Sequence, residues 1–345
     1  MKKKVNIGWI GSGFIGQVAH LRNFYLNKNV NISAISELRP NLAKKVQKKY
    51  NIKKYYSNYK EMIAENKFDA IVAIVRRYHT AKVAYDVLNL DQNLFTEKPL
   101  APSFEIGKKL VNLAEKKKLT YVIGNMRRFD PGINKAKKLF DKFSKNDELG
   151  ELMTFRFYCH AGNDYCNIDG NIKTNEKPPT NPTWDVYPKW IRNPKEGKEF
   201  EKFLNYYSHD INLIRFFFGN NLKIDYASKN NKSGNIYFNA GKIEGNFEFS
   251  YLDSKFWSEG FDIYFAKGMI SVQLPPAFLL NQPSKVIVKY YNKNKHINFK
   301  SDWIWSFKMQ ADNFINSLIS KKNNISSAKD TVNDLDLIEK IWKKF

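Results

Sequence analysis

An apolar strand that runs directly into a glycine-rich turn opens the sequence. Residues 5–10 read V-N-I-G-W-I, and glycines follow in the spacing G-x-G-x-x-G before a helix-like segment. In this order the first glycine allows a tight turn, the second lets the backbone approach a phosphate, and the third lets helix and strand pack closely. The pattern therefore predicts a dinucleotide pyrophosphate at the N-terminus of the helix. The expected contact residues are Gly11, Gly13, Phe14, Ile15 and Gly16.

A second strand, residues 30–36, ends at an acidic residue. Glu37 follows Gly16 by 21 positions, close to the spacing of a carboxylate that binds the adenosine ribose. Such a carboxylate accepts hydrogen bonds from both ribose hydroxyls and repels a 2′-phosphate, so NAD is favoured as the cofactor. Arg39 could instead pair with a 2′-phosphate, and NADP stays possible.

Length and composition set the broad class. A chain of 345 residues suggests two domains, and no run of 18 apolar residues is present to span a membrane. We expect the protein in the cytoplasm, because the basic N-terminus leads into a strand rather than into a signal-peptide core. Cys159 and Cys166 are predicted to be ordinary thiols, and no metal site is expected.

The formal charge of +23 raises the question of nucleic-acid binding. The lysines are spread through nearly every predicted helix, and no zinc-finger spacing or RNA-binding signature accompanies them. We interpret them as solvated helix faces and expect no nucleic-acid partner and no membrane partner. A positive field would still concentrate anionic substrates such as nucleotide-linked or acidic sugars.

The first 124 residues alternate between predicted strands and helices, which favours a parallel, doubly wound α/β sheet. The expected helices are 15–26, 40–50, 60–66, 80–90 and a helix capped by Ser103 that ends near residue 118, and the expected strands include 70–75, 93–96 and 121–124.

After residue 124 the pattern changes to a series of strands flanked by helices. This order predicts an α+β domain with a large, mostly antiparallel open sheet. We therefore expect a dinucleotide-binding domain at residues 1–124 and a substrate-binding and oligomerisation domain at 125–345. The expected helices are 133–143, 203–218, 307–320 and 331–342, and the expected strands are 152–160, 236–239, 242–251, 261–265, 269–274 and 286–291.

Two stretches carry candidate chemistry. Glu97, Lys98 and Pro99 stand where a strand of the first domain ends, the edge at which open α/β sheets bind ligands, so Lys98 would face the nicotinamide. By spacing alone it could equally be a solvated lysine. On the helix predicted for 203–218, Asn205, His209 and Asn212 share one face. That face is either a polar pocket or a satisfied part of the core.

These motifs together resemble the Gfo/Idh/MocA oxidoreductase family, the relatives of glucose–fructose oxidoreductase and inositol dehydrogenase. The resemblance rests on motifs along nearly the whole chain: G-S-G-F-I-G at 11–16, His79 followed by a helix and E-K-P-L-A at 97–101, G-N-M-R-R-F-D-P at 124–131, the helix with His209, the hairpin F-A-K-G-M-I-S-V at 265–272, and A-D-N-F-I-N-S-L-I near the end.

The resemblance implies a Rossmann domain joined to a domain whose open sheet often forms the oligomer interface, and so a homo-oligomer, either a dimer or a tetramer. It also implies that Lys98 and His209 are catalytic and that the substrate is a sugar, polyol or nucleotide-linked sugar. Further contact residues are expected around this pair. These are Arg76, His79, Glu97 and Asn125 at the cofactor and Asn205, Arg128 and Tyr207 at the substrate.

The chain departs from the family at two positions beside His209. The family commonly has Asp four residues before the histidine and Asp three residues after it, where this chain has Asn205 and Asn212. An asparagine can orient an imidazole or a substrate hydroxyl, but it cannot stabilise imidazolium charge as a carboxylate does.

We hypothesise hydride transfer between a carbinol carbon and C4 of nicotinamide, with His209 as general base and Lys98 beside the developing oxyanion. The two roles could be exchanged. The alternative is a non-catalytic nucleotide-binding regulator or sugar sensor on the same fold. The aromatic segment from Trp184 to Trp190 could stack on a substrate ring, contact another copy of the chain or belong to the core.

Overall fold

The computed structural model describes residues 4–162, 169–178, 184–320 and 324–345. The chain forms two compact units. Unit 1 comprises Met1–Asn125, Asp169–Asn205 and Phe307–Leu335, and unit 2 comprises Met126–Ile168, Tyr206–Ser306 and Asp336–Phe345. The chain thus leaves unit 1 close to the boundary drawn from the sequence at residue 124, and it returns to unit 1 twice.

Unit 1 contains a six-stranded sheet in the order β3-β2-β1-β4-β5-β6, with every neighbouring pair parallel. Its strands are β1 (Val5–Ile10), β2 (Val30–Ser36), β3 (Lys54–Tyr56), β4 (Ala70–Ala73), β5 (Leu94–Thr96) and β6 (Tyr121–Ile123). The run of apolar residues in β4 is buried at every position, as expected for a strand covered on both faces. Because β1 pairs with both β2 and β4, the strand order reverses at β1, and ligands of such sheets bind at that point.

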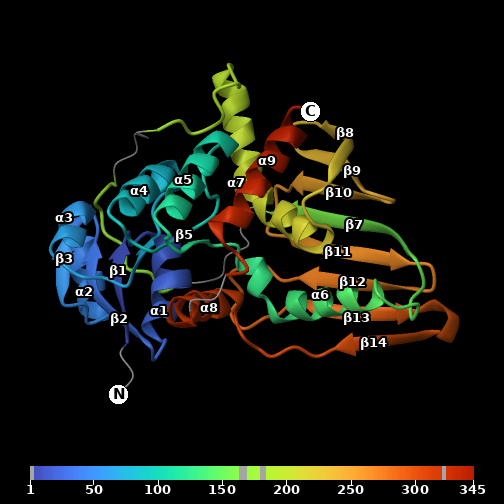
Figure 1. Cartoon of the computed structure of the whole chain (residues 1–345), viewed down its shortest axis with the longest axis horizontal. Coiled ribbons are helices and arrows are strands. Elements are labelled where there is room, and N and C mark those ends of the chain that lie inside the picture. The colour runs from blue at the N-terminus through green and yellow to red at the C-terminus, as the bar shows by residue number, and fades with distance from the viewer. Residues whose placement is uncertain (1–3, 163–168, 179–183, 321–323) are drawn as a thin grey trace. The chain divides into compact units, whose positions relative to one another are not determined.

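Helices pack against this sheet, and Figure 1 shows α4 and α5 side by side. The helices are η1 (Gly16–Leu21), α1 (Arg22–Tyr25), α2 (Pro40–Lys49), α3 (Tyr59–Ala64), α4 (Arg77–Asn89), α5 (Phe104–Lys116), α8 (Ser306–Ser320) and α9 (Ala328–Trp342). The predicted cap of α5 is confirmed, since the Ser103 hydroxyl accepts a hydrogen bond from the N–H of Ile106 at 3.3 Å. Phe314 of α8 packs against Phe24 and Phe95 in the core, so the C-terminal part of the chain completes this unit.

The last strand of this sheet, β6, also depends on the C-terminal part of the chain. Val122 forms an antiparallel bridge with Ser327, and the N–H of Ile123 donates to the carbonyl of Ser326 at 3.0 Å. These bonds occupy backbone groups that an edge strand would otherwise leave unpaired.

The helix predicted for 15–26 is present as a continuous helical segment from residue 14 to residue 25. Its middle part, residues 16–21, is a π-helix, and α1 follows. The wider turn accommodates two buried polar side chains, Gln17 and His20, both of which bond to groups elsewhere in unit 1. Such π-turns are frequent at functional sites.

Unit 2 contains an eight-stranded sheet in the order β14-β13-β12-β11-β7-β10-β9-β8. Its strands are β7 (Leu152–Ala161), β8 (Lys223–Lys229), β9 (Ser233–Ala240), β10 (Ile243–Tyr251), β11 (Trp257–Phe265), β12 (Gly268–Leu274), β13 (Lys285–Tyr290) and β14 (Lys295–Phe299). Of the strand pairs in this sheet, β7 with β10 is parallel and the others are antiparallel. The predicted fold class is therefore confirmed for both sheets.

Helices α6 (Pro131–Phe143) and α7 (Pro194–Phe218) supply aromatic side chains to the inner face of this sheet. Phe217 of α7 packs against Phe261 with ring centroids 4.8 Å apart, and Phe143 of α6 packs against Phe265 at 6.2 Å. The sequence placed the start of α7 at residue 203, but the helix begins nine residues earlier, and the added segment includes buried Phe200. Strands β3, β8 and β14 were not predicted. In the described part of the chain, no helix is both long and apolar enough to cross a membrane.

Candidate active site

The glycine turn at the end of β1 has the geometry that a dinucleotide requires. Gly11 has φ +89°, and a Cβ there would lie 2.4 Å from the carbonyl oxygen of Ile74, so only glycine fits. A Cβ on Gly13 would meet nothing within 4 Å, which leaves room for a phosphate against the backbone. The hydroxyl of Ser12 is buried and has no hydrogen-bond partner among the described residues. These features fit a pyrophosphate, which the loop from Gly11 to Gly16 would hold.

Glu37 lies at the end of β2, beside this turn, and its side chain is almost fully buried. Its Oε2 accepts a hydrogen bond from the backbone N–H of Ser12 at 2.7 Å. Arg39 donates to both carboxylate oxygens, from Nε at 2.8 Å and from Nη2 at 3.0 Å. The structure therefore joins Glu37, predicted at the ribose, and Arg39, predicted as a possible partner of a 2′-phosphate, in a bidentate ion pair at the turn.

Lys98 follows β5, and its preceding residue organises the local backbone. Glu97 accepts a hydrogen bond from the backbone N–H of Lys98 at 2.9 Å through Oε2, and its Oε1 lies 2.6 Å from Nε2 of buried His20. The peptide between Lys98 and Pro99 is cis. Gly124, in the predicted G-N-M-R-R-F-D-P motif, leaves space for this carboxylate, because a Cβ there would lie 3.0 Å from Oε1 of Glu97.

The half-buried Lys98 points its ammonium group at helix α7. Nζ donates a hydrogen bond to the carbonyl oxygen of Asn205 at 2.6 Å. Asn205 lies four residues before His209 in the same helix, and both residues are half-buried. Two of the predicted site residues, Lys98 and Asn205, are therefore in direct contact.

The other residues predicted at the cofactor have mixed environments. Asn125 is buried, and its Nδ2 donates to the hydroxyl of Thr331 at 2.9 Å. Arg76 is exposed as the N-cap residue of α4, two residues after buried Ile74. His79 lies in the first turn of that helix, and its Nε2 is buried with no partner among the described residues. Arg76 and His79 are therefore near the carboxyl edge of β4, and their contact with a cofactor stays a prediction.

Two of the residues predicted at the substrate are buried within unit 2. Arg128 is 4% exposed, and its Nε donates to Oδ1 of Asn212 at 2.7 Å while its guanidinium lies over the ring of Phe216. Tyr207 is fully buried against Phe249, with ring centroids 4.8 Å apart. Burial raises the pKa of the Tyr207 hydroxyl far above its usual value. Both side chains support the packing of α7, and their contact with substrate stays a prediction.

A buried polar cluster lies directly after His209 in the sequence. Asp210 and Cys159 are both fully buried, and burial raises the pKa of each, reinforced at Asp210 by the charge of Glu259. Glu259 pairs with Arg127, and it also accepts a hydrogen bond from the indole N–H of Trp257 at 2.9 Å. Arg127 interacts with both buried acids, Asp210 and Glu259. Because its single positive charge can balance only one carboxylate, the other acid is favoured to keep its proton. Cys166 lies outside the described residues.

For three polar residues of unit 1, the sequence predicted no role. Gln17 binds the backbone of Ile172 through both ends of its amide, at 2.8 and 3.0 Å. His20 orients Glu97, as described above. Glu176 accepts hydrogen bonds from the first backbone N–H groups of α2. Their partners are 77 to 155 residues away along the chain, so no local spacing signals them.

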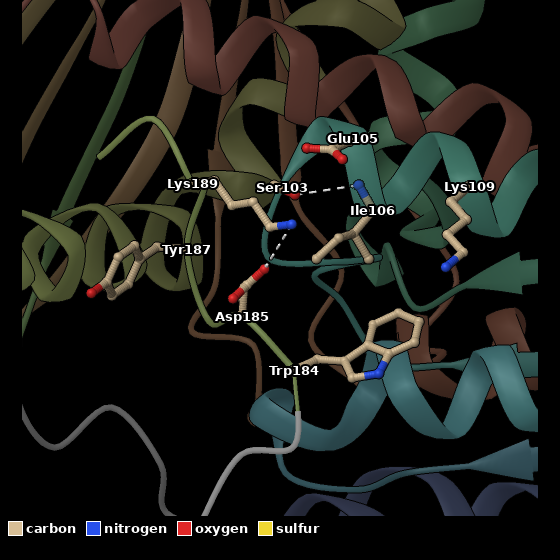
Figure 2. A pocket seen from close by; sticks show the side chains of 8 residues that line it. All are labelled: Ser103, Glu105, Ile106, Lys109, Trp184, Asp185, Tyr187 and Lys189. Atoms are coloured by element: carbon tan, nitrogen blue, oxygen red, sulfur yellow. Dashed lines mark hydrogen bonds and ion pairs between the residues drawn. The ribbon is translucent and has the colours of Figure 1, made fainter. Parts of the chain in front are cut away.

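A cavity of about 340 Å³ lies at the N-terminal end of α5 (Figure 2). Figure 2 shows the indole of Trp184 close to Lys109 and the ion pair of Asp185 with Lys189, whose atoms are 3.9 Å apart. Trp184 also packs against Tyr85 with centroids 5.3 Å apart. The residues that line the cavity are Ser103, Glu105, Ile106, Lys109, Trp184, Asp185, Tyr187 and Lys189. Of the alternatives for the Trp184–Trp190 segment, these contacts favour packing within unit 1.

Among the described residues, no group of three His, Cys, Asp or Glu side chains could hold a metal ion.

Comparisons with known proteins agree with this geometry. The model of the oxidoreductase family with an NAD-binding Rossmann fold, GFO_IDH_MocA, matches residues 5–125. An inositol 2-dehydrogenase/D-chiro-inositol 3-dehydrogenase of Shouchella clausii is 34% identical over 143 residues, which cover 40% of each chain. The chain spans less than half the length of that relative, and matches to the other curated relatives are similarly partial.

Two solved structures share the fold over almost the whole chain. One is KijD10, a 3-ketoreductase from Actinomadura kijaniata in complex with NADP and TDP-benzene, with a TM-score of 0.77, 13% identity and coverage of 99% of this chain and 98% of that one. The other is an oxidoreductase from Agrobacterium radiobacter in complex with NAD+, L-tartaric acid and magnesium, with a TM-score of 0.75, 16% identity and coverage of 99% and 96%.

The glycine turn and the parallel sheet define a Rossmann domain of the kind that binds a nicotinamide dinucleotide. Residues 5–125 match the model of the Gfo/Idh/MocA family, in agreement with the resemblance drawn from the motifs.

Proposed function

We propose that the protein is an NAD(P)-dependent dehydrogenase or ketoreductase that acts on a secondary carbinol or ketone of a sugar, polyol or nucleotide-linked sugar. The observation that carries this proposal is the hydrogen bond of Lys98 to the carbonyl of Asn205, one helical turn before His209. The relative named as an inositol dehydrogenase and the 3-ketoreductase structure with TDP-benzene support this substrate range.

The reaction requires a proton and a hydride to leave the same carbinol. The bound nicotinamide supplies the hydride acceptor at C4, or the donor in the reverse direction. His209 takes the hydroxyl proton as general base, which contributes about 10²–10⁴-fold to the rate. The ammonium of Lys98 stabilises the negative charge that develops on the oxygen. Glu97 holds the backbone of Lys98 and so positions the ammonium. The roles of Lys98 and His209 could be exchanged.

We also propose that the protein is a homo-oligomer formed through the outer face of the eight-stranded sheet. One face of this sheet is buried, and the alternate residues carry exposed aromatic side chains, including Tyr226 and Tyr237 at 58% and 46% exposure. Tyr158 and His160 of β7 stack on the same face, with ring centroids 6.1 Å apart. Exposed aromatic side chains are enriched at interfaces between proteins.

The catalytic assignment is tested with Lys98→Ala and His209→Ala. Nicotinamide absorbance is followed during incubation with a panel of sugars, polyols and nucleotide-linked sugars, and purified protein is examined by mass spectrometry for retained cofactor. Each variant should lower kcat/KM by about 10²–10⁴-fold. The matched controls are Lys329→Ala and His296→Ala, at exposed positions of α9 and β14. Wild-type turnover by both folded variants would refute the assignment, and cofactor binding without turnover of any substrate class would favour the regulator alternative.

A further inference from the structure

A short segment far along the sequence lies beside the ribose-recognition residues. Residues 170–176, here called the strap, run along helix α2 from its last residue to its first turn. Lys49, which ends α2, donates from Nζ to the carbonyl of Gly170 at 3.0 Å. In the middle, the backbone of Ile172 is held by both ends of the Gln17 amide. Gln17 also donates to the carbonyl of Ser12 at 2.8 Å, so the strap is tied to the glycine turn.

The strap ends with a carboxylate at the start of α2. Oε1 of Glu176 accepts from the backbone N–H of Asn41, and Oε2 accepts from that of Leu42, both at 3.0 Å. Arg39 is the N-cap residue of this helix, and its side chain makes no capping bond. Glu176 therefore supplies the negative charge that a helix N-terminus favours, from a position 135 residues away along the chain.

Glu176, Arg39 and Glu37 form one electrostatic cluster. The bidentate pair of Arg39 with Glu37 uses both oxygens of that carboxylate, and Ser12 and the backbone of Arg39 bond to it as well. Glu37 and Glu176 both act on the neighbouring hydroxyl of Tyr55, whose pKa is raised by burial first and by these two charges next. Burial alone would raise the pKa of Glu176. The hydrogen bonds from Asn41, Leu42 and Thr174 outweigh this effect and hold the pKa below its usual value. Glu176 is thus negatively charged at neutral pH.

The position of this charge bears on the choice of cofactor. NAD and NADP differ by a phosphate on the adenosine 2′-oxygen, the atom that a carboxylate at the end of β2 recognises. A phosphate there would seek the free N–H groups of the α2 N-terminus and the guanidinium of Arg39. In this protein two carboxylates already occupy these groups: Glu176 takes the N–H groups, and Glu37 takes the guanidinium.

We infer that Glu176 is a cofactor-specificity residue: by occupying the N-terminus of α2 from the strap, it excludes the 2′-phosphate of NADP and makes the protein select NAD. This inference rests on the proposed binding of a nicotinamide cofactor at the glycine turn. It assigns specificity to a residue outside the Rossmann β2–α2 segment, in addition to Glu37. Glu176→Gln keeps an oxygen for the helix cap and removes the charge, whereas Glu176→Ala also frees the two N–H groups.

The experiment measures Kd for NADH and NADPH by isothermal titration calorimetry on the full-length protein. Wild type should bind NADH more tightly than NADPH. Glu176→Gln should lower Kd for NADPH by roughly five- to ten-fold, the effect of removing one nearby like charge, and should leave Kd for NADH within about two-fold. Glu176→Ala should lower Kd for NADPH further. Adding Arg39→Ala to Glu176→Ala should abolish that gain, because the guanidinium that receives the phosphate is removed.

Glu115→Gln is the matched control, because Glu115 forms an exposed ion pair with Lys329 and should leave both constants unchanged. Circular dichroism checks that each variant is folded. An unchanged ratio of the two constants in both Glu176 variants overturns the inference while the proposed function stands. Wild-type protein that binds NADPH as tightly as NADH also overturns it. If wild type binds neither NADH nor NADPH, the proposed function fails, and the inference fails with it.

Discussion

At the scale of single residues, the most unusual group in unit 2 is the buried cluster of Asp210, Cys159, Glu259 and Arg127. Removing one partner of a buried ion pair strands a charge in an apolar interior and typically costs about 3–5 kcal/mol. Arg127 has further support, because its Nη1 donates to the carbonyl of Pro275 at 2.8 Å. The cluster therefore ties the η2 turn (Met126–Phe129) to strand β11 and to the residue that follows β12. It lies beside the predicted catalytic histidine in the sequence and supports the helix that carries it.

We predict that Asp210 makes the stability of the protein pH-dependent. The pKa of Asp210 is raised by burial first and by the charge of Glu259 next. An acid with a raised folded-state pKa stays protonated in the native state while the unfolded chain ionises above about pH 4. Stability is thus lost as the pH rises from about 4 toward the folded-state pKa. Asp210→Asn should therefore gain free energy of unfolding relative to wild type between pH 4 and pH 8, as measured by urea denaturation at several pH values.

The control for this prediction is Asp147→Asn, because Asp147 is 82% exposed and pairs with Lys267 at the surface. Its difference from wild type should stay small across the same pH range, as expected for an exposed pair. A constant offset between Asp210→Asn and wild type at every pH would show that Asp210 is ionised in the native state and that the prediction is wrong.

At the scale of elements, helix α6 begins at a cap that also fixes a neighbouring turn. Oδ1 of buried Asp130 accepts from the N–H groups of Gly132 at 2.8 Å and Ile133 at 3.1 Å. The same oxygen accepts from the N–H of Ser284 at 3.0 Å, in the turn before β13. A Cβ on Gly132 would lie 2.2 Å from the carbonyl oxygen of Ser284, so this contact requires glycine. The side chain of Asp130 thus joins the start of α6 to the turn before β13.

We predict that Asp130→Ala lowers the free energy of unfolding by about 2–3 kcal/mol, because it leaves several buried N–H groups unsatisfied. Asn58→Ala is the matched comparison: Asn58 caps the short helix α3 by accepting from the N–H of Lys60 at 2.9 Å at an exposed position. It should cost about 1 kcal/mol or less, because water can replace the bond. Equal losses in the two variants, measured by urea denaturation, would contradict the importance that we assign to burial of the cap.

The elements also show how far local sequence patterns reach. The glycine turn, Glu37, the buried strand β4 and the Ser103 cap were all predicted, because each has a local signal of periodicity or spacing. Strand β3, which has three residues, and strand β14, which is mostly exposed, were missed because neither shows clear alternation. Strand β8 was missed as well. The partners of Gln17 and His20 were missed for a different reason. They are set by tertiary packing, and a single sequence carries no pairing information for them.

At the scale of the whole molecule, we predict that the protein in solution is a dimer or tetramer of the 40.4 kDa chain. Light scattering coupled to size exclusion should give a mass that is a multiple of the chain mass. Tyr237→Arg, on the outer face of the sheet, should shift the mass toward the monomer, because it places a charge where aromatic surface would be buried. Leu38→Arg, at an exposed position of unit 1, is the control. A monomeric wild type would refute the proposal, and an unchanged mass for Tyr237→Arg would exclude this position from the interface.

The bond between β6 and the residues around Ser326 has a consequence for how the protein is made. A ribosome releases residues 1–125 long before residues 326 and 327 exist, so the nascent Rossmann sheet has an open edge at β6 during most of translation. An unpaired edge strand is a template for association with other chains. The late-arriving segment closes this edge and also delivers α8 to the core around Phe24. The strands of this sheet are synthesised early, but the edge at β6 is complete only after residues 326 and 327 have left the ribosome.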